Sequence, residues 1–338
     1  MATFILPVLQ IAVLLGVVLA AVAYLVLLER KVQAWVQVRL GPMRVGPHGS
    51  LQPVADGIKL LLKEDITPVR ADKWVFTLAP IIAMVPALIA FAVIPFGRSV
   101  TLFGYTVPLF VADVNVGLLY IVSIASIGVY GIILAGYASN SKFPLLAGLR
   151  ASAQLISYEI AVTMMLVSIV ATAGTLSMVG LVEAQQAQHV WYLFLQPVAF
   201  VVIFIGGLAE TNRSPFDLPE AEQELVGGFH TEYSGMRFAL FFLAEYANMI
   251  VIAAVATTVF FGGWLRPFPN VGVLWILDYV PGWVWFGLKT FCFIDLTMWI
   301  RATLPRYRYD QLMRLGWKVL IPVGIANLVV TAILKVLL

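Results

Sequence analysis

Residues 210–246, which read ETNRSPFDLPEAEQELVGGFHTEYSGMRFALFFLAEY, decide the fold. This stretch crowds carboxylates between two apolar segments that are each long enough to cross a membrane. Glu210 ends the first segment, and Glu245 lies well inside the second. An ionisable side chain inside a membrane span costs roughly 2.5–3.5 kcal/mol, so such groups usually line a pathway or pair with one another. A solvated acidic loop is the ordinary alternative, but the apolar flanks favour a functional role for these carboxylates at the membrane boundary.

The composition around this stretch is that of a polytopic membrane protein. Hydrophobic residues make up 61% of the 338 residues, charged residues make up 12%, and the mean hydropathy is +0.95. An apolar stretch of about 20 residues crosses a hydrocarbon core about 30 Å thick. We therefore predict an all-α fold in which residues 1–338 form one transmembrane domain with about eight transmembrane helices plus interfacial amphipathic helices. The predicted spans are about residues 4–27, 75–97, 115–138, 154–179, 191–209, 238–262, 281–303 and 319–337.

The distribution of basic residues predicts the orientation of these spans. Most lysines and arginines fall in four connections, about residues 28–74, 139–153, 210–237 and 304–318. The opposite side holds only Arg98, Arg266 and Lys335. By the positive-inside rule, the four basic connections face the cytoplasm or its organelle equivalent, and both termini face outward. The first apolar run has full spanning length and lacks a basic leader, so we expect a retained helix rather than a cleaved signal peptide.

Redox chemistry within this chain alone is not expected. The single cysteine, Cys292, cannot hold an iron–sulfur cluster, which usually needs four cysteines. His48, His189 and His230 are too scattered to indicate a metal or haem site, and no nucleotide-binding glycine pattern follows a predicted strand. We expect no metal and no covalently bound cofactor in the chain, and no nucleic-acid partner. Any oxidoreductase role must be shared with partner subunits.

The first inward connection contains a predicted amphipathic helix. Val54, Ile58, Leu61 and Leu62 recur at helical spacing, while Asp56, Lys59 and Lys63 occupy the other face. Such a helix lies in the plane of the membrane interface rather than across it. A simple surface anchor would show the same pattern.

Four ionisable residues fall within the predicted spans: Glu159, Glu245, Lys289 and Asp295. A buried carboxylate tends to take up a proton, because burial disfavours its charged form, so Glu159 and Glu245 are candidates for a proton relay. The alternative is a polar clasp between neighbouring helices. For Asp295 we expect a structural role, in which it pairs with Lys289 or Arg301.

Glu220, Glu222 and Glu224 crowd like charges in the acidic connection, whether that segment is helical or extended. Crowded carboxylates hold protons more readily and titrate as a coupled group, which suits proton uptake from the inward side. Compensating charge is available from Arg213, Asp217 and Arg237.

Several motifs, in order along nearly the whole chain, resemble one family. They are LERK at 28–31, RLGP at 39–42, LQPVADGIKLLLKE at 51–64, SNSKFPLLAGLRASAQLISYEIA at 139–161, residues 210–246, and IRATLPRYRYDQLMRLGWK at 300–318. Together they look like the H subunit of proton-translocating NADH:quinone oxidoreductase, respiratory complex I. The resemblance implies a membrane-arm subunit at the junction with the peripheral arm, in the bacterial inner membrane or the equivalent organelle membrane. The partners it implies are the peripheral-arm quinone-site and iron–sulfur subunits, other membrane-arm subunits and membrane lipid.

The resemblance also implies roles for particular residues. An acidic chain from the quinone chamber into the membrane arm would contain Glu159, Glu210, Glu220, Glu222, Glu224 and Glu245. Around the chamber and its entrance would lie Arg30, Arg39, Asp56, Lys59 and Phe229. Quinone is the implied substrate, and the residues that protonate it directly would belong to a peripheral subunit. Met43 stands where the family commonly has Asn, which concerns a turn contact or quinone preference rather than the family assignment.

Two other interpretations remain open from the sequence. The homologous subunit of a membrane-bound hydrogenase, or of a ferredoxin- or F420-linked complex, shares this helix plan, and identification of the co-purified peripheral subunits would distinguish it. A free-standing cation transporter also uses intramembrane Glu and Lys residues, although long charged inward connections suit docking better than solo transport. The type of quinone and the electron donor are not determined by the sequence.

Overall fold

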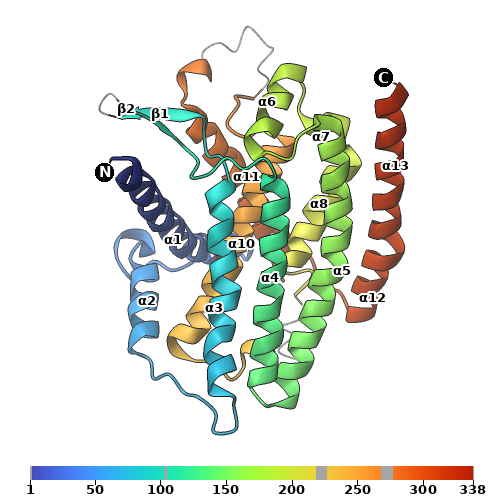
Figure 1. Cartoon of the computed structure of the whole chain (residues 1–338). Coiled ribbons are helices and arrows are strands. Elements are labelled where there is room, and N and C mark those ends of the chain that lie inside the picture. The colour runs from blue at the N-terminus through green and yellow to red at the C-terminus, as the bar shows by residue number, and fades with distance from the viewer. Residues whose placement is uncertain (1, 103–104, 218–226, 268–276, 338) are drawn as a thin grey trace.

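The computed structural model describes residues 2–102, 105–217, 227–267 and 277–337, and these form a helical bundle (Figure 1). The longer helices are α1 (Ala2–Val36), α3 (Lys73–Ile89), α4 (Gly117–Ala138), α5 (Lys142–Ala173), α8 (Pro197–Glu210), α10 (Gly235–Phe260), α11 (Gly282–Thr303) and α13 (Ile321–Leu337). Shorter helices are α2 (Gln52–Leu62), α6 (Met178–Gln188), α7 (Tyr192–Leu195) and α12 (Tyr309–Leu315). Single turns are η1 (Pro47–Gly49), η2 (Ala90–Val93), η3 (Gly228–His230) and the π-helical η5 (Gly316–Leu320). A small antiparallel hairpin pairs β1 (Ser99–Leu102) with β2 (Tyr105–Pro108).

The all-α polytopic fold predicted from the sequence is confirmed. Among the described residues, seven helices are long and apolar enough to cross a membrane, and α8 is a shorter apolar helix. The fifth predicted span, residues 191–209, is divided between α7 and α8, because Pro197 follows a non-helical residue, Gln196 (φ −132°, ψ 56°). The polar side chain of Gln196 donates to Thr331 at 2.9 Å and accepts from Asn327 at 3.1 Å, which ties this break to α13.

Several helices continue beyond the predicted spans into the inward connections. Helix α1 runs to Val36 instead of residue 27, and α5 begins at Lys142, so most of residues 139–153 are helical. Likewise, α12, η5 and α13 form one continuous helical stretch from Tyr309 to Leu337. Hydropathy detects the apolar part of a helix, and charged residues such as Lys142 and Arg150 end the apolar run without ending the helix. The bounds of apolar segments are therefore poor guides to the bounds of helices.

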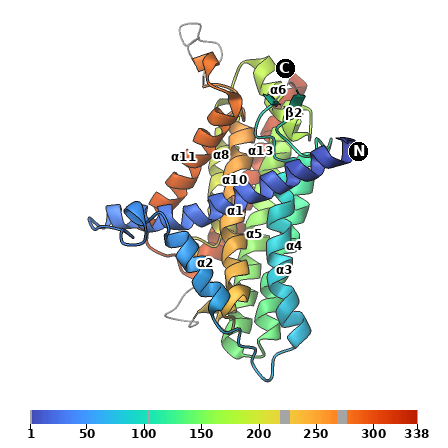
Figure 2. The same ribbon diagram turned by 90° about the vertical axis from the view of Figure 1, so that its left-hand side faces the viewer.

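Helix α1 crosses the other helices obliquely (Figure 2). Its 35 residues correspond to about 52 Å, well above the thickness of a hydrocarbon core of about 30 Å. The C-terminal half of α1 packs against α10 and α11, and α2 lies beside it. The predicted amphipathic helix is confirmed as α2, and Val54, Ile58, Leu61 and Leu62 are all exposed along it.

Close helix approach in the bundle depends on small residues. An added Cβ at Gly131 of α4 would lie 2.7 Å from the backbone nitrogen of Ala83 in α3. Small residues let two backbones approach closely where lipid offers no hydrophobic driving force between helices. The largest core cluster lies deeper in the bundle and joins buried residues of α5, α8 and α10, including Tyr158, Val202 and Ala254.

A group of aromatic side chains packs together around the start of α8 and the end of α10. Phe200, Phe260, Phe261 and Phe293 pack together, with ring centroids 5.1–6.0 Å apart between Phe200 or Phe261 and their neighbours. We refer to these four residues as the aromatic cluster. Next to it, the Lys289 ammonium donates to three backbone carbonyls, those of Phe261, Gly263 and Leu265, at 2.6–3.0 Å.

Lys289 therefore binds the carbonyl end of α10 and the turn that follows it, where helix C-terminal partial charge favours a cation. Within the described residues, neither Lys289 nor Arg301 forms an ion pair with Asp295, contrary to expectation. Arg301 is engaged elsewhere, with Glu29 of α1. Both cations have oxygen partners on other elements, which the spacing along α11 cannot reveal.

Candidate functional site

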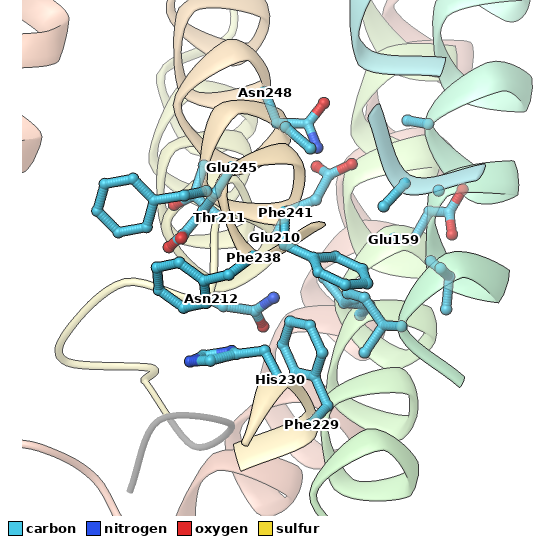
Figure 3. Close-up of a pocket in the computed structure, with 18 residues that line it drawn as sticks. Glu159, Glu210, Thr211, Asn212, Phe229, His230, Phe238, Phe241, Glu245 and Asn248 are labelled. Atoms are coloured by element: carbon cyan, nitrogen blue, oxygen red, sulfur yellow. The ribbon is translucent and has the colours of Figure 1, made fainter. Parts of the chain in front are cut away.

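Three glutamates from three helices line one cavity inside the bundle. Glu159 comes from α5, Glu210 from the end of α8 and Glu245 from α10 (Figure 3). The cavity has a volume of about 80 Å³. Its other polar lining groups are Thr211, Asn212, His230 and Asn248. Residues that lie 86 positions apart in the sequence, Glu159 and Glu245, thus face a common space.

Local structure at the end of α8 places Glu210 in this cavity. The helix ends at Glu210, and Asn212 adopts a left-handed conformation (φ 49°) that redirects the chain. Asn is among the few residues other than Gly that adopt this conformation at low cost. The buried amide of Gln154 on α5 donates to the carbonyls of Ala209 and Phe216, both at 2.8 Å. These two bonds hold the segment after α8 against α5, and so fix Glu210 near Glu159.

Glu159 also connects two helices. It accepts a hydrogen bond from Ser126 of α4, while its carboxylate lines the cavity. The sequence left open whether Glu159 is a relay or a polar clasp between helices. The structure contains the clasp to α4, and Glu159 also lines the cavity together with the other two acids.

A buried cluster of charges adjoins the cavity. It consists of Glu29, Arg213, Glu245, Tyr246 and Arg301, and we call it the ion cluster. Arg213 Nη1 donates to both oxygens of Glu29 at 2.6 and 2.7 Å, and Arg213 Nε lies 3.1 Å from Glu245 Oε1. The Tyr246 hydroxyl donates to Glu29 at 2.6 Å, and Arg301 is a second cation on the same carboxylate.

Burial makes this cluster sensitive to the loss of any one member. Glu29 and Arg213 have side chains only 3% and 4% exposed. Removing one partner of a buried ion pair leaves an uncompensated charge, which costs about 3–5 kcal/mol. The Arg213 guanidinium also lies over the Tyr246 ring, 4.2 Å from its centroid. The arrangement joins α1, α10, α11 and the segment after α8 at one point.

Sequence reasoning assigned no role to Glu29 or to a pairing of Arg301 with it. It expected Arg213 to compensate the carboxylates of the acidic connection, whereas the structure places Arg213 between Glu29 and Glu245. The only signal for Glu29 in the sequence is its place in the LERK motif, where it looks like an ordinary charge at the end of a span. The other expected compensating residues form separate pairs, Asp217 with Arg306 at 2.8 Å and Arg237 with Asp65 at 3.0 Å.

His230 and Phe229 lie in the turn η3 at one end of the cavity. The Phe229 ring is buried and packs edge-on against Phe241, with ring centroids 5.3 Å apart. Burial lowers the pKa of His230 from 6.5 to about 4, with the Asp217 carboxylate acting weakly in the opposite direction. His230 is therefore neutral near pH 7, and a neutral imidazole has one nitrogen that donates and one that accepts.

A second group of predicted residues lies where α1 meets α2. Arg30 Nη1 contacts Asp56 Oδ2 at 2.9 Å, and Gln52 donates to the other oxygen of Asp56 at the same distance. Lys31 donates to the carbonyl of His48 at 2.7 Å, which holds the turn η1 against α1. Both side chains of the Arg30–Asp56 pair are partly exposed.

The structure separates the predicted chamber residues. Lys59 is exposed one turn beyond Asp56 on α2, and Arg39 is exposed in the turn after α1, where its Nε donates to Gln37. Phe229, by contrast, belongs to the acid-lined cavity. Glu220, Glu222 and Glu224 lie outside the described residues. Within the described part of the chain, no group of three His, Cys, Asp or Glu side chains is arranged to hold a metal ion.

Comparison with known proteins adds independent information. A family model described as NADH dehydrogenase matches residues 9–332. The NADH-quinone oxidoreductase H subunit 2 of Geobacter metallireducens is 54% identical over 345 residues, which cover 99% of this chain and 96% of that protein. The H subunit 1 of Geobacter sulfurreducens is 54% identical over 96% of this chain and 93% of its own length. The H subunit of Syntrophotalea carbinolica is 50% identical over 98% of this chain and 96% of its own length.

Proposed function

The chain belongs to the family of H subunits of NADH-quinone oxidoreductase and is thus a multi-pass membrane subunit of that enzyme complex, and from this premise we propose that it couples quinone reduction to proton translocation. In this proposal the chain forms part of the quinone-binding chamber, and its acids carry the effect of quinone reduction into the membrane arm. It performs no redox chemistry alone. The catalytic unit is a proton-translocating oxidoreductase in which peripheral subunits supply electrons and protonate the quinone.

The convergence of Glu159, Glu210 and Glu245 on one cavity carries this proposal. Three carboxylates among membrane-spanning helices are costly, and such groups typically mark ion or proton pathways. A cavity of about 80 Å³ has room for a few waters, since one water occupies about 30 Å³ in the liquid. Thr211, Asn212 and Asn248 supply the partners that ordered water needs. Water between carboxylates provides a route for protons from one acid to the next.

The inward end of α1 and helix α2 supply the chain's part of the proposed chamber. The Arg30–Asp56 pair fixes these two elements relative to each other, and Lys59 and Arg39 add positive charge nearby in the sequence. A quinone has an apolar tail and two carbonyl oxygens, so a suitable site is largely apolar with few polar contacts. The exposed apolar side chains of α2, such as Leu61 and Leu62, match the apolar part of that requirement.

The proposed setting follows from the charges of the connections. The basic connections and α2 face the cytoplasm, or the equivalent organelle compartment, and dock the peripheral-arm quinone-site and iron–sulfur subunits. Both termini face the opposite side. Exposed apolar faces of the outer helices, such as Val329 and Ile333 on α13, contact lipid or other membrane-arm subunits. Glu220, Glu222 and Glu224 belong to the same proposed chain of acids.

Replacement of Glu210 by Gln tests the proposal, because Gln keeps the size of the side chain and cannot exchange a proton. In the assembled complex reconstituted into liposomes, E210Q should lower NADH-driven proton pumping and quinone reduction by about tenfold or more. Electron transfer from NADH to ferricyanide, which bypasses the chamber, should stay within about twofold of the unmodified complex. Glu183→Gln is the matched control, since Glu183 is exposed and far from the cavity, 3.9 Å from Arg98. Unchanged pumping in an assembled E210Q complex would rule out the relay.

A further inference from the structure

Arg213 contacts two carboxylates that differ in their surroundings. Glu29 is 3% exposed and is held by Arg213, Arg301, Tyr246 and Gln33. Glu245 is 20% exposed and lines the acid cavity. One guanidinium therefore joins a fully enclosed carboxylate on α1 to a carboxylate that faces the proposed proton path.

The two contacts of Arg213 also differ in geometry. Nη1 makes two short hydrogen bonds to Glu29. On the other edge, neither Nε nor Nη2 donates a hydrogen bond to any residue in the described ranges, although Nε is only 3.1 Å from Glu245 Oε1. A carboxylate that uses the full edge of a guanidinium makes two parallel bonds, so the contact with Glu245 is incomplete. Of the two carboxylates, Glu245 is the more exposed and the one that lines the cavity.

We propose that Glu29 is a fixed counter-ion that shares the charge of Arg213, and thereby sets how readily Glu245 exchanges a proton with the cavity. This inference rests on the proposed function, because it concerns one acid of the proposed relay. Glu29 is a positioning residue here: it acts through Arg213 and touches neither the quinone nor the cavity. Arg301 has the opposite effect on Glu245, because it adds a second positive charge beside Glu29.

The charges of the ion cluster explain the expected effect. Two carboxylates, Glu29 and Glu245, balance two guanidinium groups, Arg213 and Arg301. Removal of the Glu29 charge leaves an excess positive charge beside Glu245, and a nearby positive charge favours an ionised carboxylate. The other titratable groups that share the cavity with Glu245 or pack beside it are Glu159 of α5, Glu210 of α8, His230 of η3 and Tyr246 of α10.

The position of Glu29 on α1 connects the ion cluster to α2. The next residue, Arg30, pairs with Asp56 of α2 at the proposed mouth of the quinone chamber. Successive residues on a helix point in directions about 100° apart, so α1 presents Glu29 to the ion cluster and Arg30 to α2 from the same turn. A shift of the inward end of α1 would move both contacts together.

Three variants of the assembled complex test the inference through the pH dependence of proton pumping in liposomes. Glu29→Gln should move the midpoint of the pumping profile toward acid by on the order of one pH unit, because Glu245 then holds its proton less readily. Arg301→Gln should move the same midpoint toward alkaline pH. The double variant E29Q/R301Q restores the charge balance, and its midpoint should return to within about a third of a pH unit of the unmodified complex. As a control, Glu29→Asp keeps the charge and should stay near the unmodified midpoint.

The directions of these shifts distinguish a charge effect from a structural one. A lower pumping rate in both single variants without a shift of the pH midpoint would overturn the inference. A double variant that pumps more slowly than either single variant would overturn it as well. If E29Q does not assemble, an unmoved midpoint in R301Q overturns it alone. The proposed function stands or falls separately, since E210Q tests the relay without changing Glu29, Arg213 or Arg301.

Discussion

At the scale of single residues, Arg213 is the central cation of the ion cluster. It is buried between α1 and α10, and its immediate neighbours are Glu29, Glu245 and the ring of Tyr246. Its two hydrogen bonds to Glu29 are charge-assisted, and such bonds are about twice as strong as neutral ones. Arg and Lys are not interchangeable at such a site, because a lysine ammonium is a point charge without two bonding edges.

His230 should make the stability of the chain dependent on pH. Its pKa is lowered by burial to about 4, whereas an unfolded chain has an ordinary histidine pKa of about 6.5. The unfolded state therefore binds a proton between these two pH values while the folded state does not. The stabilising contribution is complete above pH 6.5 and is lost as the pH falls from 6.5 toward 4.

The expected result is a lower thermal midpoint for the detergent-solubilised complex at pH 5 than at pH 7, measured by the temperature at which this chain dissociates or aggregates. Carboxylates also titrate in this range, so the comparison is with His230→Gln, which cannot gain a proton there. The fall between pH 7 and pH 5 should be smaller in H230Q. An equal fall in both proteins would show that His230 is not held neutral.

At the scale of helices, α3 and α4 offer a matched pair of positions. Gly131 of α4 has no room for a Cβ, which would lie 2.7 Å from the backbone nitrogen and 2.9 Å from the Cα of Ala83. Gly128 lies one turn earlier on the same helix, and its nearest contact would be 4.0 Å away. Backbone atoms cannot rotate aside as a side chain can, so the two glycines should respond differently to the same substitution.

Gly131→Ala should destabilise the α3–α4 pair by about 1–3 kcal/mol through overpacking. Gly128→Ala should be neutral or stabilise by up to about 1 kcal/mol, because Ala favours a helix over Gly. The measurement is the fraction of complex that retains this chain on native gels after heating in detergent. Equal retention for G131A and G128A would mean that α3 and α4 separate at little cost.

The helices also show what sequence reasoning can and cannot provide. The apolar spans and the amphipathic helix α2 were predictable, because each depends on neighbouring residues and their periodicity. The break at Gln196 and Pro197 was missed within a continuous apolar run, although Pro197 was a local signal. The ion cluster depends on pairing over long separations, since Glu29 lies 184 positions from Arg213 and 272 from Arg301. No local pattern records such pairs.

At the scale of the whole molecule, the two termini lie at the same end of the bundle (Figure 1). Seven helices of the described residues are long enough to span a membrane, and with the short pair α7 and α8 as an eighth crossing the chain would return to the side from which it began. The charged residues accordingly divide between the two ends: Arg213, Asp217 and Arg306 lie beyond the end of α8, opposite the aromatic cluster. The acid-lined cavity lies between these two ends.

The aromatic cluster should act as a barrier to proton flow between the acid-lined cavity and the nearer end of the bundle. Phe260 lies 15 residues beyond Glu245 on α10, or about 22 Å along the helix, and the described residues between them are largely apolar. Under the proposed function, charge that reaches the cavity leaves sideways into a neighbouring subunit, and the resting complex should hold a pH gradient across liposomes without leakage. Phe260→Ala should raise passive proton leakage severalfold by dye fluorescence, whereas Phe291→Ala, at an exposed position of α11, should not. Rapid leakage through the unmodified resting complex, or equal leakage from both variants, would show that the barrier to protons lies elsewhere. Proton flow through the enzyme would then not be limited to a lateral exit from the cavity.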